Sequence, residues 1–118
     1  MTRDELKQRV DEAIERHADE IIEVGETIRR HPELGFKESR TAALVESKLL
    51  KLGLTPRTGL ALTGIRADVP GGQGPGPTFA LLGELDALVV TGHPEADPHT
   101  GAAGSRETTT GRSWSLVS

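Results

Sequence analysis

Apolar side chains recur every three or four residues through the first quarter of the chain and form one stripe, at Leu6, Val10, Ile14, Ala18, Ile21, Val24 and Ile28. Charged residues fill the positions between them, which is the pattern of an amphipathic helix. Thr2 and Glu5 have the spacing of a capping box, in which each side chain accepts a hydrogen bond from a backbone N–H at the helix start. Pro32 disfavours a helical conformation at His31. The pattern therefore predicts one helix from about Thr2 to His31.

A second apolar stripe predicts a helix that begins near Ser39. Its members are Ala42, Val45, Leu49 and Leu52. Gly53 follows directly and is suited to the left-handed conformation that ends many helices. In the connector between the two helices, residues 31–36, Gly35 suits a tight turn and Glu33 is either a cap or a substrate contact.

The second half of the chain changes to the patterns of strands and turns. Apolar residues alternate with Arg66 and Asp68 within Leu60–Val69, which predicts a strand with one face in water. The Gly- and Pro-rich stretch Pro70–Pro77 predicts a turn between adjacent strands. Phe79–Leu82 is continuously apolar, as in a strand buried on both faces. The predicted fold class is therefore α/β, with helices layered on a few strands.

Two carboxylates, Glu84 and Asp86, follow the apolar run, at the end of a strand where open α/β sheets carry their chemistry. Residues two apart in an extended chain share a face, so both side chains are expected on one side. From spacing alone, a functional site and a solvated strand end are equally acceptable readings. His17 and His31 are expected to have structural roles, because lone histidines near helix ends are commonplace.

Length and composition limit the class of protein. The chain of 118 residues allows one domain, and its content of 35% hydrophobic and 3% aromatic residues predicts a modest aliphatic core. The net charge of −4 argues against a general nucleic-acid binder. The chain has no cysteine and no apolar run of membrane-spanning length, so the cytoplasm is the expected compartment.

Five short motifs occur in order along the chain: His31-Pro-Glu-Leu-Gly-Phe-Lys-Glu38, Thr41-Ala-Ala43, Leu52-Gly53, Leu62-Thr-Gly-Ile-Arg-Ala-Asp68 and Leu81-Leu-Gly-Glu-Leu-Asp-Ala-Leu88. Together they resemble the start of the metal-dependent amidohydrolases and the aminoacylase and carboxypeptidase-like peptidases. This family includes hydrolases of auxin conjugates, hippurate and p-aminobenzoyl-glutamate. The resemblance implies the N-terminal part of a zinc-peptidase-like α/β catalytic domain that hydrolyses amide bonds of N-acyl amino acids or small peptides.

The resemblance also implies roles for the two carboxylates. Asp86 matches the family's aspartate near the metal centre, where it would orient a ligand or support an activated water. Glu84 occupies the position of a histidine metal ligand in the peptidase branches and is a more speculative ligand. The implied cofactor is a divalent metal, Zn²⁺ or Mn²⁺, in the full-length family, and it is not expected to bind stably to this chain. The implied partner is a small amide or peptide substrate, with no nucleic acid and no membrane.

The chain departs from the family pattern after Ala103. The family continues there into a His-Ala-Cys-Gly-His segment that binds metal, whereas residues 104–118 contain neither Cys nor His. This departure predicts a truncated catalytic part over residues 1–103, an irregular and non-native tail over 104–118, and a frameshift or premature end near residue 103. His93 and His99 lie in a Pro-containing stretch and are expected to be loop residues and not compensating metal ligands.

Two classes of function follow. The first is an amidohydrolase fragment that is inactive as this chain. The alternative is a small non-enzymatic α/β module that binds a partner through an exposed sheet edge or uncovered helix faces. A cooperative monomer would favour the module, and aggregation or partial disorder would favour the fragment.

Overall fold

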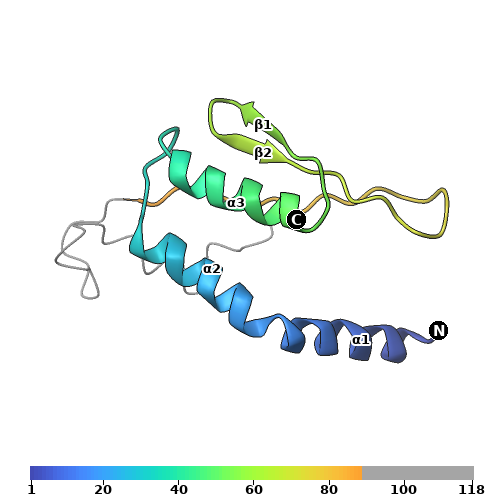
Figure 1. Ribbon diagram of the computed structural model, residues 1–118. Coiled ribbons are helices and arrows are strands. Elements are labelled where there is room, and N and C mark those ends of the chain that lie inside the picture. The colour runs from blue at the N-terminus through green and yellow to red at the C-terminus, as the bar shows by residue number, and fades with distance from the viewer. Residues whose placement is uncertain (89–118) are drawn as a thin grey trace.

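Helices form the first half of the chain, and a short hairpin follows them. The computed structural model describes residues 1–88. Within them lie α1 (Arg3–Arg16), α2 (Ala18–Arg30), α3 (Ser39–Lys51), β1 (Arg57–Leu60) and β2 (Gly64–Arg66), as Figure 1 shows. The strands pair antiparallel, and α3 packs against β2. The predicted α/β class is confirmed at this coarse level.

The prediction of one continuous helix from Thr2 to His31 was wrong, because the helix is interrupted at His17. This residue has φ −107° and ψ 7°, and α1 and α2 meet there at an angle (Figure 1). The charges at the break favour two helix ends. Arg16 lies in the last turn of α1, while Asp19 and Glu20 lie in the first turn of α2. Cations stabilise helix C-termini and anions stabilise N-termini. These charges therefore indicate the break, which the continuous apolar stripe does not.

The predicted start and end of α3 are confirmed. The N–H of Gly53 donates to the Leu50 carbonyl over 2.9 Å, and the N–H of Leu54 donates to the Leu49 carbonyl over 3.1 Å. With φ +80° at Gly53, these bonds form a Schellman motif, which satisfies carbonyls that the helix end leaves free. The capping box at Thr2 and Glu5 is also present.

The hairpin differs from the predicted strand Leu60–Val69. In that range Gly64–Arg66 forms β2, and Leu60 is the last residue of β1, a strand that was not predicted. The chain reverses at Ala61 and Leu62, which have φ of 46° and 79°. Gly64 is required directly after this turn, because a Cβ there would lie 2.5 Å from the Leu60 carbonyl oxygen. The turn contains no Asn-Gly or Asp-Gly pair, so the usual sequence signal of a hairpin is missing.

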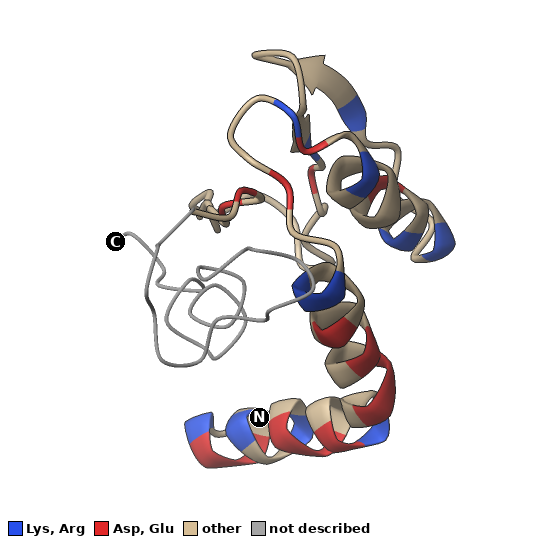
Figure 2. Cartoon of the chain, turned by 90° about the vertical axis from the view of Figure 1, so that its left-hand side faces the viewer, with Lys and Arg blue, Asp and Glu red and all other residues tan. Residues whose placement is uncertain are grey.

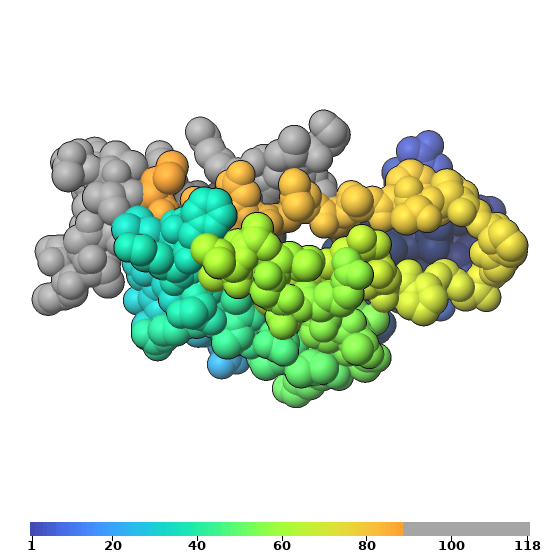
Figure 3. Space-filling model, turned by 90° about the horizontal axis from the view of Figure 1, so that it is seen from above, coloured from blue at the N-terminus to red at the C-terminus, as the bar shows by residue number. Residues whose placement is uncertain are grey.

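The apolar run Phe79–Leu82 is not a strand, which corrects the prediction from its sequence, and Pro70–Pro77 does not join adjacent strands. No helix or strand lies within residues 78–88. Phe79 is 86% exposed and Leu81 is 84% exposed. A strand that is apolar on both faces needs hydrogen-bonded neighbours and a covering layer. Figure 3 shows this segment running along the outside of α3 and the hairpin, beyond the projecting turn.

Little of the described chain is buried. Ala87 is the one buried hydrophobic residue within residues 1–88, and Glu38 and Thr41 are the buried polar residues of the same part of the chain. Lys48 of α3 and Glu20 of α2 form an ion pair at 3.2 Å, which links the two helices. Both signs of charge cover α1 (Figure 2). Among the helices described, none combines the length and the apolar character needed to cross a membrane.

Candidate functional site

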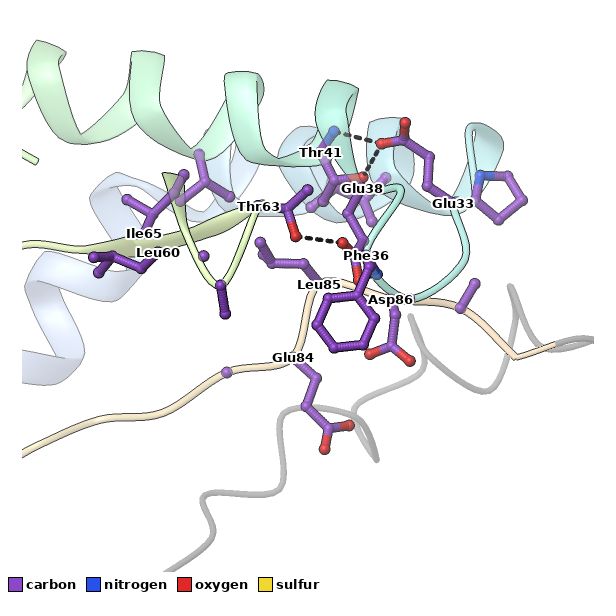
Figure 4. Close-up of a pocket in the computed structure, with 18 of the residues that line it drawn as sticks. Glu33, Phe36, Glu38, Thr41, Leu60, Thr63, Ile65, Glu84, Leu85 and Asp86 are labelled. Carbon is purple, nitrogen blue, oxygen red and sulfur yellow. Dashed lines mark hydrogen bonds between the residues drawn. The ribbon is translucent and has the colours of Figure 1, made fainter. Parts of the chain in front are cut away.

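A pocket of 620 Å³ lies where the connector before α3, the hairpin turn and the segment 82–87 come together. Its walls are mostly apolar, with Ile28, Val45 and Ile65 among them, and four acidic residues also line it: Glu33, Glu38, Glu84 and Asp86. Figure 4 shows these acids around the connector. The pocket therefore combines an apolar wall with carboxylates. The hydrogen bonds that each carboxylate already accepts decide whether its oxygens are available to a ligand.

Glu33 is committed to capping α3. Its carboxylate accepts hydrogen bonds from the Thr41 N–H at 2.6 Å, the Thr41 hydroxyl at 2.8 Å and the Arg40 N–H at 3.1 Å. Partial burial raises the pKa of Glu33, but the bonds from Thr41 and Arg40 outweigh this effect and hold the pKa below its ordinary value. Of the two roles predicted for Glu33, the structure therefore shows the cap.

Glu38 connects the start of α3 to the hairpin. Its Oε2 accepts a hydrogen bond from the Thr63 hydroxyl at 2.6 Å, and its Oε1 accepts one from the Phe36 N–H at 2.9 Å. The bond from Thr63 is the main cause that lowers the pKa of Glu38, against the opposing effects of burial and of the Glu33 charge. Glu38 is 6% exposed, so a charged group is kept in the interior by directed donors.

The segment that carries Asp86 is fixed to the same connector. The Ala87 N–H donates to the Glu33 carbonyl over 2.7 Å. A Cβ placed on Gly35 would lie 4.0 Å from an oxygen of Asp86 and 4.0 Å from an oxygen of Glu38. Asp86 is thus held, half-buried, against a glycine of the connector.

Glu84 and Asp86 are the uncommitted acids of the pocket. Glu84 is exposed, and within residues 1–88 neither carboxylate has a hydrogen-bonding partner. Figure 4 shows both side chains directed away from α3. The two predicted site residues therefore lie in one pocket, although the strand that was expected to present them is not formed.

These acids do not make a metal centre by themselves. In the part of the chain that the structure describes, no group of three or more His, Cys, Asp or Glu side chains could hold a metal ion. A zinc site requires three or four protein ligands, and Glu33 and Glu38 direct their oxygens at hydrogen-bond donors. The described residues offer at most part of such a site.

Reasoning from sequence missed the supporting threonines, Thr41 and Thr63. Both lie within the five family motifs, but those motifs indicated no hydrogen bond for either, and their partners are 8 and 25 residues away in the chain. The ring nitrogen Nδ1 of His31 lies 3.0 Å from the Thr27 carbonyl oxygen, one turn earlier in the chain. His93 and His99 lie outside the described residues.

Comparisons with known proteins give several relatives that are named as amidohydrolases or carboxypeptidases. YhaA of Bacillus subtilis, which is named as a putative amidohydrolase, is 33% identical over 85 residues, which cover 72% of this chain and 21% of the relative. The IAA-amino acid hydrolase ILR1-like 6 of Arabidopsis thaliana is 42% identical over 67 residues, covering 57% of this chain and 14% of the relative. Thermostable carboxypeptidase 2 of Saccharolobus solfataricus is 34% identical over 87 residues, covering 73% of this chain and 22% of the relative.

Over the matched residues the chain is similar to proteins named as amidohydrolases and carboxypeptidases. It spans about a fifth of the length of the relatives from Bacillus and Saccharolobus. No family profile matches the chain, and no solved structure matches it. The similarity to amidohydrolases therefore rests on sequence identity to the curated relatives.

Proposed function

We propose that this chain forms the N-terminal part of an amidohydrolase catalytic domain that hydrolyses amide bonds of N-acyl amino acids or small peptides. Identity to three named hydrolases supports this proposal. The pocket that holds Glu84 and Asp86 is the observation that carries it, because uncommitted carboxylates beside an apolar wall suit an amide substrate with an apolar acyl group. In the whole protein the cofactor is a divalent metal, Zn²⁺ or Mn²⁺, with further ligands from outside residues 1–88.

Asp86 is the residue of this chain with the strongest case for a part in the reaction. The next residue, Ala87, is hydrogen-bonded through its N–H to the Glu33 carbonyl, and the Asp86 carboxylate lies near Gly35 of the connector. A half-buried carboxylate in a fixed position orients a bound group at little entropic cost. The 118-residue chain alone is proposed to be inactive, since residues 1–88 hold two uncommitted carboxylates, which are fewer than a metal centre needs, and residues 104–118 contain neither Cys nor His.

A chimaera tests the proposal. The segment of the Bacillus relative that matches this chain is replaced by that of this chain, and hydrolysis of N-acetyl amino acids is measured with added Zn²⁺ or Mn²⁺. We expect turnover, and we expect Asp86→Asn to lower kcat/KM by about 10- to 100-fold, as for residues that support metal ligands. Asp68→Asn is the matched control, because Asp68 is exposed and pairs with Arg66 away from the pocket.

Two results would contradict the proposal. If the chimaera is folded and inactive on all N-acyl amino acids and dipeptides offered, the substrate class is wrong. If Asp86→Asn and Asp68→Asn have equal effects, Asp86 has no part in the site. For the chain alone, turnover that Asp86→Asn abolishes would overturn its proposed inactivity.

A further inference from the structure

Phe36 places an aromatic side chain in the wall of the pocket and leaves most of that side chain exposed. It is one of the residues that line the pocket, and its exposed fraction is 68%. Aromatic side chains are scarce in this sequence, which contains two phenylalanines, one tryptophan and no tyrosine. A covered aromatic ring contributes a large apolar contact area. The exposed ring of Phe36 therefore offers contact area to an apolar group that enters the pocket.

The backbone of Phe36 adopts a conformation that costs free energy. Its φ is +62°, in the left-handed region that bulky side chains rarely occupy. Gly35 could take such a φ without strain, but the positive φ falls on the residue that carries the ring. Strained backbone of this kind persists where the surrounding structure holds it, and it is concentrated at active sites and ligand-binding sites.

Glu38 holds the strained residue in place. One oxygen of its buried carboxylate accepts the Phe36 N–H at 2.9 Å, and the other accepts the Thr63 hydroxyl at 2.6 Å. These bonds join the connector to the hairpin and fix the backbone from which the ring projects. In the view of Figure 4, the ring is directed away from α3 and towards the segment that carries Glu84 and Asp86. The ring is therefore presented on the side of the pocket where the uncommitted carboxylates lie.

A structural role is the alternative, in which Phe36 anchors the connector by packing into the interior. Such an anchor would be buried, whereas Phe36 is mostly exposed. The connector is also fixed by polar bonds, since the Glu33 carboxylate accepts from Thr41 and the Glu33 carbonyl accepts from Ala87. Within residues 1–88 the connector is thus held without the ring.

We propose that Phe36 is a specificity-determining residue of this pocket, whose ring packs against the acyl group of the amide substrate and favours apolar acyl groups larger than acetyl. The inference rests on the proposed function, because the ligand is taken to be an N-acyl amino acid. The mostly apolar walls suit such a group. Phe36 directly follows Gly35, and a Cβ on Gly35 would lie 4.0 Å from an oxygen of Asp86. The ring and this carboxylate can therefore contact neighbouring parts of one substrate.

Nuclear magnetic resonance of the full 118-residue chain tests the contact. The chain is isotopically labelled in its phenylalanine rings and titrated with N-phenylacetylglycine and N-acetylglycine, two ligands that differ by one phenyl ring. We expect saturable shifts of the Phe36 ring signals, with a half-saturation concentration about tenfold lower for N-phenylacetylglycine, as for an added apolar group in a pocket. The ring of Phe79 does not line the pocket, and its signals should not move.

Substitutions separate the effect of the ring from the effect of the fold, with binding monitored at the Thr63 amide signal. Phe36→Ala should raise the half-saturation concentration for N-phenylacetylglycine by about tenfold and leave that for N-acetylglycine nearly unchanged. Phe36→Gly should give the same loss, and it keeps the test valid if the alanine variant does not fold, because glycine takes a positive φ without strain. Circular dichroism of each variant should match the parent chain.

Leu62→Ala is the matched control. Leu62 has a φ of +79° and is 74% exposed, like Phe36, but it does not line the pocket. Its substitution should leave the binding of both ligands unchanged.

Three outcomes would overturn the inference. These are shifts that are absent at the Phe36 ring or equal at the Phe36 and Phe79 rings, equal half-saturation concentrations for the two ligands, and equal effects of the Phe36 and Leu62 substitutions.

The chimaera with the Bacillus relative separates this inference from the proposed function. Its Phe36→Ala variant should show about a tenfold lower ratio of kcat/KM for N-phenylacetylglycine to kcat/KM for N-acetylglycine. Hydrolysis with an unchanged ratio leaves the proposed function standing and overturns the role of Phe36. Binding at the Phe36 ring in the full chain, without hydrolysis by the chimaera, leaves the contact standing and counts against the function.

Discussion

Four acidic residues line one pocket, yet their hydrogen bonds divide them into two pairs. Glu33 and Glu38 direct their oxygens at N–H and hydroxyl groups of the connector, α3 and the hairpin. Glu84 and Asp86 have no such donors within residues 1–88. The four acidic residues thus differ in the hydrogen bonds that they accept, although all of them line the pocket. Asp86 accepts none within residues 1–88 and is therefore the residue to test for function.

The bond between Thr63 and Glu38 should contribute measurably to stability. Thr63→Val keeps the shape of the side chain and removes the hydroxyl that donates to a buried carboxylate over 2.6 Å. We expect a loss of about 1.5 kcal/mol or more in the free energy of unfolding, as for hydrogen bonds to charged groups. Urea denaturation measures this loss. Thr58→Val, at an exposed position of β1, is the control and should change stability by less than about 0.5 kcal/mol.

Stability should fall when the pH drops into the acid range. The pKa values of Glu33 and Glu38 are lowered in the folded chain, so their contribution is complete above the unfolded pKa of about 4.3. It is lost as the pH falls through the lower folded values. A variant with Glu33→Gln and Glu38→Gln should be less stable than the parent chain at pH 7, and the difference should shrink towards pH 3. Thermal unfolding across this range measures it, and a constant difference would refute the role of ionisation.

Alanine substitutions at two glycines, one within a helix and one just after a helix, should change the free energy of unfolding in opposite directions. Gly53 has φ +80° at the end of α3, where a Cβ costs about 1–2 kcal/mol. Gly25 lies within α2 and a Cβ there would meet no atom within 4 Å, so alanine should stabilise the chain by about 0.5–1 kcal/mol. Urea denaturation of Gly53→Ala and Gly25→Ala compares them directly. Equal effects would mean that the left-handed cap is not formed in solution.

Among the elements, α1 depends most on its own sequence. It has no buried residue, and Leu6, Val10 and Ile14 are at least half exposed. A helix of 14 residues is marginal in water without such packing. Its capping box at Thr2 and Glu5 therefore matters more than a cap on a packed helix.

Removing this cap should shift the helix content of α1. Thr2→Ala deletes the hydroxyl that accepts from the Glu5 N–H over 3.1 Å, which costs a helix about 1 kcal/mol. We expect backbone chemical shifts of Arg3–Arg16 to move towards random-coil values, with those of α3 unchanged. Thr2→Ser keeps the oxygen and should behave as the parent chain, and an unchanged α1 in Thr2→Ala would show that packing sustains it.

The helix ends that were predicted correctly are those set by residues close together in the sequence. The bounds of α3 follow from its apolar stripe and Gly53, and the start of α1 follows from Thr2 and Glu5, because each signal acts within a few residues. The run Phe79–Leu82 was assigned from its apolar character, but a strand exists only through its neighbours. The pairing of Glu38 with Thr63 joins residues 25 apart, and no local pattern reports it. Asp86 was found through the resemblance, and the pocket then placed it beside Gly35.

Seen as a whole molecule, the described chain exposes most of its large apolar side chains. Ala87 is its one buried hydrophobic residue within residues 1–88. In most proteins the burial of apolar surface is the main source of favourable folding free energy. Folding of residues 1–88 alone removes little apolar surface from water, so this contribution is small here. The free energy that holds the fold comes to a greater extent from helix formation and from the hydrogen bonds around Glu33 and Glu38.

Unfolding of the free chain should accordingly be broad. The urea m value scales with the surface that unfolding exposes and is about 1–3 kcal/mol per molar for small proteins. We expect a value below about 1 kcal/mol per molar, measured by circular dichroism. A steep, single transition in the free chain would instead mean that its exposed apolar side chains share a core in solution.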